Sequence, residues 1–124
     1  MKKFEKMKIE TKELENNLEN FHGTEKYFRN FTGLKYTDGI QYLAEKAGAY
    51  WLIDLIGSYQ HSLKDRPFQV WTLKVNEDKT AVVTCKEDTN EPVIVKQELE
   101  YTDFPLKEFE CYCIDGVLLL KSEY

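Results

Sequence analysis

The chain has 124 residues, 42% of them hydrophobic, and a formal net charge of −5. That length is typical of one domain, and the core it can bury needs neither a metal nor a disulfide to fold. Residues 1–12 hold five lysines against two glutamates, so the rest of the chain is acidic, which disfavours direct binding to DNA or RNA.

The sequence also carries no sign of export or membrane insertion. Its three cysteines are an odd number, which is typical of a reducing compartment rather than of a disulfide framework. Residues 1–6 lack the apolar region of a secretory signal, and the longest apolar run, residues 47–56, is too short for a membrane span and contains Asp54. We therefore expect a cytoplasmic protein without membrane association.

Two short helices are predicted near the N-terminus. Residues 1–12 are expected to form a frayed, Lys-rich start, followed by apolar residues at helical spacing. A break at Gly23 separates these from a second segment, in which Thr24 is a candidate N-cap. The aromatic residues of that second segment fall on one helical face: Tyr27, Phe28 and Phe31.

A longer helical region is predicted from Ile40 to Tyr59, because apolar residues recur there at helical spacing. Thr37-Asp38-Gly39 precedes it and supplies a capping side chain, and a cap is the simpler role for Asp38. Gly48 lies inside the pattern, where we expect it to bend the helix or to admit a close neighbour.

After Pro67 the period of the pattern changes from 3.6 to 2, which predicts strands. Five short strands are expected, at residues 69–75, 80–85, 93–101, 109–113 and 117–120. The last two are joined by Asp115-Gly116, a strong signal for a two-residue hairpin. Alternation in the third strand places Val93 and Tyr101 on its covered face and leaves the other face polar. Because the connections are short, we expect an antiparallel meander.

The grouping of helices before strands indicates an α+β fold, because no helix is available to cross over between parallel strands. We expect one domain over residues 1–124. In it, the N-terminal helices pack on one face of a C-terminal antiparallel sheet of about five strands.

Six stretches of the sequence are distinctive when taken together. They are residues 21–28, 36–44, 48–54, 68–73, 101–106 and 116–124. The set resembles a family of short proteins from bacteria, phages and mobile elements that is described only as a domain of unknown function. The resemblance covers the chain from about Phe21 and implies a compact single domain, but it supplies no catalytic residues. The Lys-rich first twenty residues depart from the family pattern.

Asp54, Ser58 and His61 share one helical face, an arrangement reminiscent of a Ser-His-acid triad. Asp54 and His61 are about 10 Å apart along a helix axis, since each residue rises about 1.5 Å. The acid therefore cannot orient a histidine that also reaches Ser58, and a solvated polar stripe is the better interpretation.

The cysteines and histidines are candidate zinc ligands: Cys85, Cys111, Cys113, His22 and His61. Their spacing lacks the two-cysteine turn of a typical zinc site. Burial in the core is the better interpretation of the cysteines, and no adjacent base is present to activate a thiolate. We expect no metal and no cofactor.

Tyrosines and acids supply the remaining candidates, because aromatic rings with a polar tip are enriched in binding surfaces. Trp51 and Trp71 are better interpreted as core. Asp38 and Asp103 each follow a Tyr-Thr pair; a helix cap and a turn are their simpler roles, and an acid–base pair is the alternative. The candidate interaction or pocket residues are Tyr36, Asp38, Tyr50, Asp54, Tyr59, His61, Tyr101 and Asp103.

The sequence has no phosphate-binding glycine loop, Cys-x-x-Cys or nucleophile elbow. We therefore expect a non-catalytic module that binds a protein partner, an accessory protein of a phage or mobile element. Its acidic body suits the basic cleft of a host nucleic-acid-handling or defence protein.

Two alternatives stay open. One is a small enzyme or small-molecule-binding domain, with a pocket between helices and sheet where Tyr50, Asp54, His61 and Tyr101 converge. The other is a homodimer formed through an exposed edge strand, with residues 117–120 as the candidate.

Overall fold

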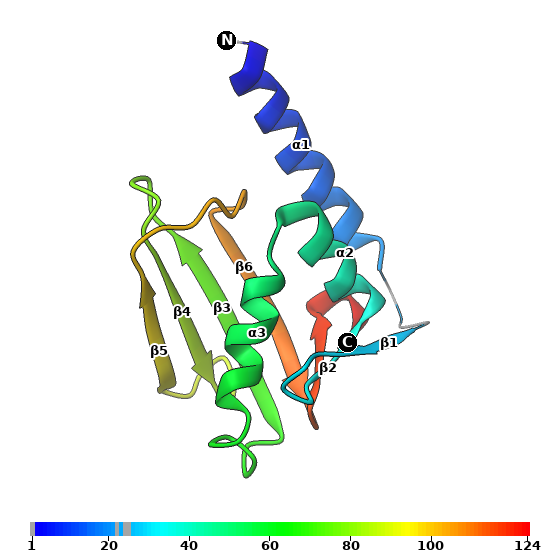
Figure 1. Cartoon of the computed structure of the whole chain (residues 1–124), viewed down its shortest axis with the longest axis vertical. Coiled ribbons are helices and arrows are strands. Elements are labelled where there is room, and N and C mark those ends of the chain that lie inside the picture. The colour runs from blue at the N-terminus through cyan, green and yellow to red at the C-terminus, as the bar shows by residue number, and fades with distance from the viewer. Residues whose placement is uncertain (1, 22, 24–25) are drawn as a thin grey trace.

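The structure is a computed structural model that describes residues 2–21, 23 and 26–124, with side chains from Thr11 onward. Its helices are α1 (Lys2–Glu19), α2 (Asp38–Ala47), α3 (Tyr50–Tyr59) and the short 3-10 helix η1 (Lys121–Glu123). Its strands are β1 (Tyr27–Arg29), β2 (Lys35–Thr37), β3 (Phe68–Val75), β4 (Ala81–Lys86), β5 (Val93–Leu99), β6 (Glu108–Ile114) and β7 (Val117–Leu120). The predicted α+β class is confirmed (Figure 1).

The strands form one mixed sheet in the order β1-β2-β7-β6-β3-β4-β5. β3, β4 and β5 follow one another as a meander, but β6 returns to pair with β3 on its other side. Three consecutive strands and a fourth beside the first make a Greek key, so the predicted five-strand meander is wrong. The returning connection, residues 100–107, buries Phe104 and Leu106, which favours this path over a simple hairpin.

β1 and β2 are two strands that the sequence did not predict. Residues 27–31 were expected to be helical, but Tyr27–Arg29 pairs antiparallel with β2, and β2 pairs in parallel with β7. Phe28 turns inward and stacks on Tyr36 with ring centroids 5.5 Å apart, whereas Tyr27 and Arg29 stay exposed. A strand of three residues is too short to show its period in the sequence.

This pairing also corrects the predicted free edge. β7 lies between β6 and β2, so residues 117–120 have strand neighbours on both sides and are not an edge. The edges of the sheet are β1 and β5. The hairpin at Asp115-Gly116 is confirmed: both residues have positive φ angles, as a tight two-residue turn requires.

The region predicted as one helix from Ile40 to Tyr59 is two helices. Gly48 adopts a left-handed conformation (φ 62°) and its N–H bonds to the carbonyl of Ala44, which ends α2. The N-cap of α2 is Thr37, whose Oγ1 accepts from the N–H of Ile40 at 3.2 Å. Asp38 follows as the first helical residue, so its predicted capping role is wrong.

The N-terminal helix α1 is continuous from Lys2 to Glu19, over the segment for which the sequence predicted a frayed start. Its inner side chains Leu14 and Leu18 join the core. The proposed roles of Thr24 as an N-cap and His22 as a zinc ligand lie outside the described residues. Across the described ranges, no helix has the length and hydrophobicity of a transmembrane span.

The core lies between the helices and one face of the sheet, as predicted. α2 and α3 lie on that face (Figure 1). The strand positions that they cover alternate with outward positions, and they include Trp71, Leu73, Val83, Cys85, Val95, Phe109, Cys111, Cys113 and Leu118. The predicted burial of Trp71 and of the three cysteines is therefore confirmed.

Alternation fails at both ends of β5. The register against β4 shifts between Cys85 and Lys86, so that Val93 lies opposite Lys86 and Ile94 is the extra residue of a bulge. Val93 is therefore exposed on the uncovered face, and Tyr101 is 70% exposed beyond the strand end. The prediction that both lie on the covered face is wrong.

A buried amide network fixes the end of α3 to β3. Gln69 is 2% exposed; its side chain exchanges two hydrogen bonds with Gln60 (2.9 and 3.0 Å) and accepts one from the indole of Trp71 (2.9 Å). Since every polar atom in this chain of contacts has a partner, the network holds the helix in one position without a desolvation penalty.

The start of α2 is joined to the C-terminal segment by a buried hydrogen bond. Thr37 Oγ1 donates to Glu123 Oε1 at 2.6 Å, and this carboxylate oxygen also accepts from the N–H of Leu120 at 2.9 Å. Thr37 is 1% and Glu123 is 9% exposed. This link holds β2 beside β7, and hence the β1–β2 pair against the rest of the sheet.

We expect Thr37→Val to destabilise the fold by about 2–3 kcal/mol. It removes the N-cap of α2, at about 1 kcal/mol, and takes a donor away from a buried carboxylate, at about 1–2 kcal/mol. Urea denaturation measures the loss. Thr37→Ser retains the hydroxyl and is the matched control; equal losses in the two variants would contradict this role for the hydroxyl.

Candidate functional site on the uncovered sheet face

The face of the sheet opposite α2 and α3 carries apolar side chains. In a sheet with one face in solvent, these alternate positions are normally polar. By strand register, its outward positions include Phe68, Val70, Tyr112, Ile114, Val117 and Leu119. All but Val70 are partly exposed, and Val70 is buried between Tyr112 on β6 and Lys86 on β4. An apolar surface of this kind, left open, is typical of an interaction site.

Three aromatic rings form the centre of this face, and we call them the aromatic cluster: Phe68, Tyr112 and Tyr124. The rings of Phe68 and Tyr112 lie 5.3 Å apart. Tyr124 stands edge-on to both, at 6.0 Å from Phe68 and 5.3 Å from Tyr112, and is 77% exposed. These contacts orient the rings, so the cluster is a preformed anchor with one side in solvent.

Cations outnumber carboxylates on this face. By register, the strands direct five cations and three carboxylates to it: Arg29, Lys35, Lys74, Lys86 and Lys96, with Glu98, Glu108 and Glu110. On η1, Lys121 adds a sixth cation, which bonds to Glu110 (3.0 Å), and Glu123 adds a fourth carboxylate, which bonds to Thr37. The face therefore has a small excess of positive charge, although the chain as a whole is −5.

Glu110 is held ionised by its neighbours. Burial alone would raise the pKa of Glu110, but hydrogen bonds from Lys121 and Thr72 and the positive charges of Lys121 and Lys86 lower it on balance. The same hydrogen bond raises the pKa of Lys121. The pair stays charged at neutral pH and fixes η1, and with it Tyr124, over the sheet.

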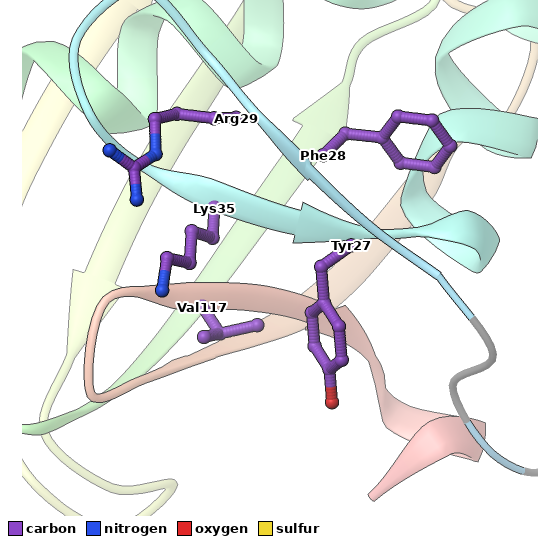
Figure 2. Close-up of a pocket in the computed structure, with 5 residues that line it drawn as sticks. All are labelled: Tyr27, Phe28, Arg29, Lys35 and Val117. Carbon is purple, nitrogen blue, oxygen red and sulfur yellow. The ribbon is translucent and has the colours of Figure 1, made fainter.

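An open pocket of about 410 Å³ lies where β1, β2 and β7 meet. Figure 2 shows Tyr27, Lys35 and Val117 on one side of these strands with Arg29 at the rim, whereas Phe28 points away. Arg29 and Lys35 are register partners. Neither pairs with a carboxylate of the described residues, so their charges are available to an anionic group.

The site residues predicted from the sequence lie elsewhere, mostly around α3. Desolvation raises the pKa of Tyr50, and the charges of the nearby Glu45 and Tyr36 raise it further. Asp54 is exposed and accepts a hydrogen bond from Asn30 (2.7 Å). Tyr59 donates to Gln97 on β5 (2.7 Å), which is a structural link between helix and sheet.

The other four predicted residues are scattered. Asp38 accepts from the N–H of Gly39 at the start of α2, and Asp103 is exposed in the loop that leads to β6. His61 is exposed after α3, and Tyr101 is exposed after β5. The structure shows no contact that joins the described atoms of Asp38 and Asp103 into an acid–base pair.

The cysteines are neutral core thiols. Burial raises the pKa of Cys85 and of Cys113 to about 12, and it raises the pKa of Cys111 well above its usual value. A thiol of this kind is not a nucleophile at neutral pH. Among the residues that the structure describes, no three His, Cys, Asp or Glu side chains gather closely enough to hold a metal ion.

The aromatic cluster was not predicted from the sequence, because an aromatic residue on a strand can be assigned to a sheet face only when the strand pairing is known. A usable signal was present: residues 117–120 are apolar without interruption, and Tyr112 and Ile114 occupy the positions that alternate with Cys111 and Cys113. Strands with apolar residues at both sets of positions need cover on both faces. In the part of the chain that the structure describes, the longer helices α2 and α3 cover one face.

These features define an α+β domain with a mixed seven-stranded sheet whose uncovered face is aromatic and basic. The chain belongs to a family of unknown function (DUF6876), whose model matches residues 12–124. The family pattern thus includes residues 12–20, and only residues 1–11 lie outside it, not the first twenty. Comparison with curated proteins gave no match, and comparison with solved structures gave none either.

The lowered pKa of Glu110 predicts a pH-dependent contribution to stability. Because the folded pKa is lower than the unfolded one, the contribution is present above the unfolded pKa and is lost as the pH falls through the folded pKa. We expect Glu110→Gln to be less stable than the wild type at pH 7, with a difference that shrinks towards pH 3. Urea denaturation across this range measures it.

Glu98→Gln is the matched control, because Glu98 is 82% exposed and its ion pair with Lys96 is 3.9 Å long. Its effect should be small at every pH. A difference between wild type and Glu110→Gln that stays constant from pH 7 to pH 3 would contradict the ionised pair.

Proposed function

We propose that the protein is a non-catalytic interaction module that binds an acidic segment of a partner protein on its uncovered sheet face. The observation that carries this proposal is the aromatic cluster with the excess of cations, on a face that α2 and α3 leave uncovered. Aromatic and arginine side chains are those that dominate the binding energy of protein interfaces.

The arrangement fits the usual anatomy of such an interface. Rings held by one another lose little conformational entropy on binding, so they form a suitable centre. The cations at the periphery raise the association rate of an acidic partner and exclude basic ones. At the pocket beside Val117, the guanidinium of Arg29 can form a bidentate pair with a carboxylate, with Lys35 alongside.

The sign of the charge changes the class of partner that the sequence favoured. A protein seated in the basic cleft of a nucleic-acid-handling enzyme needs an acidic contact surface, and this face is positive. If the target is a host defence or nucleic-acid-handling protein, the face fits an acidic surface of that target. The setting proposed for this role is the cytoplasm, acting as an accessory protein of a phage or mobile element, and three buried thiols suit that reducing compartment.

Single-stranded nucleic acid is the rival ligand, because aromatic rings and cations on an open sheet also bind bases and phosphates. A protein segment is favoured because the three rings pack against one another at tilted and edge-on angles, rather than standing as separate parallel platforms for successive bases.

Reversal of charge at Arg29 and Lys35 tests the proposal. Arg29→Glu with Lys35→Glu should reduce capture of a stoichiometric protein partner at least tenfold relative to the wild type, because two attractive contacts become repulsive. The measurement is affinity capture from a nuclease-treated host lysate, followed by mass spectrometry and titration of the captured protein.

The matched control is Lys46→Glu with Lys64→Glu, which changes the net charge equally but on the helical side of the molecule. Capture should survive this control. Equal loss in both double variants, capture that Arg29→Glu with Lys35→Glu leaves intact, or recovery of nucleic acid alone without nuclease treatment would each overturn the proposal.

A further inference from the structure

The β5 edge of the sheet is open along its backbone. β5 pairs with β4 on one side and is the last strand in the order, so no strand of the described chain lies on its other side. The opposite edge, β1, has only three residues. An exposed edge strand presents unpaired N–H and C=O groups that another strand can complete.

The regular part of β5 is short and bounded. The bulge at Ile94 interrupts the pairing with β4 at the start of the strand, and β5 ends at Leu99. The segment between them reads Val95-Lys96-Gln97-Glu98-Leu99. The neutral amide of Gln97 is at its centre. A cation and an anion flank Gln97, and an apolar residue is at each end, so the pattern is complementary to its own reverse.

That symmetry makes the strand complementary to itself. In an antiparallel pair of two β5 strands centred on Gln97, Lys96 lies opposite Glu98 of the second copy, and Val95 lies opposite its Leu99. The charged pair falls on the uncovered face and the apolar pair on the helical face, because register partners share a face. By the two-fold symmetry each contact occurs twice.

We propose that the protein forms a homodimer by antiparallel pairing of β5 with β5 of a second copy, about a two-fold axis at Gln97. Within one chain, the side chains of Lys96 and Glu98 are 62% and 82% exposed, and their charged atoms lie 3.9 Å apart. A pair this long and exposed is weak, so each residue can instead pair with the opposite charge on the second copy. The sheet then continues through both copies.

The symmetry determines how the two copies present their surfaces. A two-fold axis between antiparallel strands of one sheet is perpendicular to that sheet, so the uncovered faces of both copies lie on the same side. The dimer therefore presents both aromatic clusters on the same side of the continuous sheet, with β4 and β5 of each copy between them. This inference is independent of the proposed function, because a monomer can still bind a partner and a dimer need not.

A charge exchange tests the register. Sedimentation velocity of the wild type over a range of concentrations should show a monomer–dimer equilibrium. Lys96→Glu and Glu98→Lys should each weaken dimerisation about tenfold or more, because each places like charges opposite one another at two symmetric positions. The double variant Lys96→Glu with Glu98→Lys should restore the affinity to about that of the wild type.

Lys46→Glu is the control for net charge and should leave the dimer unchanged, since Lys46 is in the last turn of α2, which packs against β2 and β7 rather than β5. Circular dichroism of each variant checks that it is folded. A wild type that remains monomeric at the highest soluble concentration overturns the proposal. So does a dimer that both single variants leave intact, or one that the double variant does not recover.

Discussion

The hydrogen bond from Thr37 to Glu123 is the constraint on which the layout of this molecule depends. It joins the end of β2 to the segment after β7, and so fixes the one parallel pairing of the sheet. Gly39 permits the close approach: a Cβ atom there would lie 2.6 Å from Glu123 Oε1 and 2.7 Å from Leu120. Without this link, β1 and β2 are held by a short parallel ladder with β7 and by contacts with α2, and the pocket that they form with Val117 is less firmly fixed.

The uncovered face follows from the order of elements along the chain. All of the long helices precede β3, and two of them are needed to cover the side of the sheet that holds Trp71 and the cysteines. No later segment of comparable size is left for the opposite side, where η1 is three residues long and brings only Tyr124 over the strands. The apolar positions of β3, β6 and β7 on that side therefore stay in contact with solvent, unless another molecule covers them.

What the sequence could predict was set by the length of each element. Strands of four or more residues show their period, so the positions of β3, β4, β6 and β7 were found, and the Asp115-Gly116 turn identified one hairpin. The three-residue strands β1 and β2 carry no readable period. The return of β6 to β3 depends on the burial of Phe104, in a connection whose sequence resembles an ordinary loop. The break at Gly48 depends on a left-handed backbone conformation, which the surrounding helical pattern does not reveal. The candidate site was missed for a related reason, because a ring on a strand belongs to one face or the other only once the register is known.

Net charge is a poor guide to the class of partner, because a ligand meets a local surface rather than a total. Screening limits electrostatic interactions to about 8–10 Å in physiological salt, which is less than the width of this sheet. On the uncovered face the cations outnumber the carboxylates, and one of these carboxylates, Glu110, is paired with Lys121. The acidic residues that make the chain negative lie largely in the helices and loops, for example Glu13, Glu45 and Asp88. An acidic chain with a basic face is attracted to an acidic partner in one orientation only. The uneven distribution of charge over the surface, which composition does not show, would therefore orient the docking.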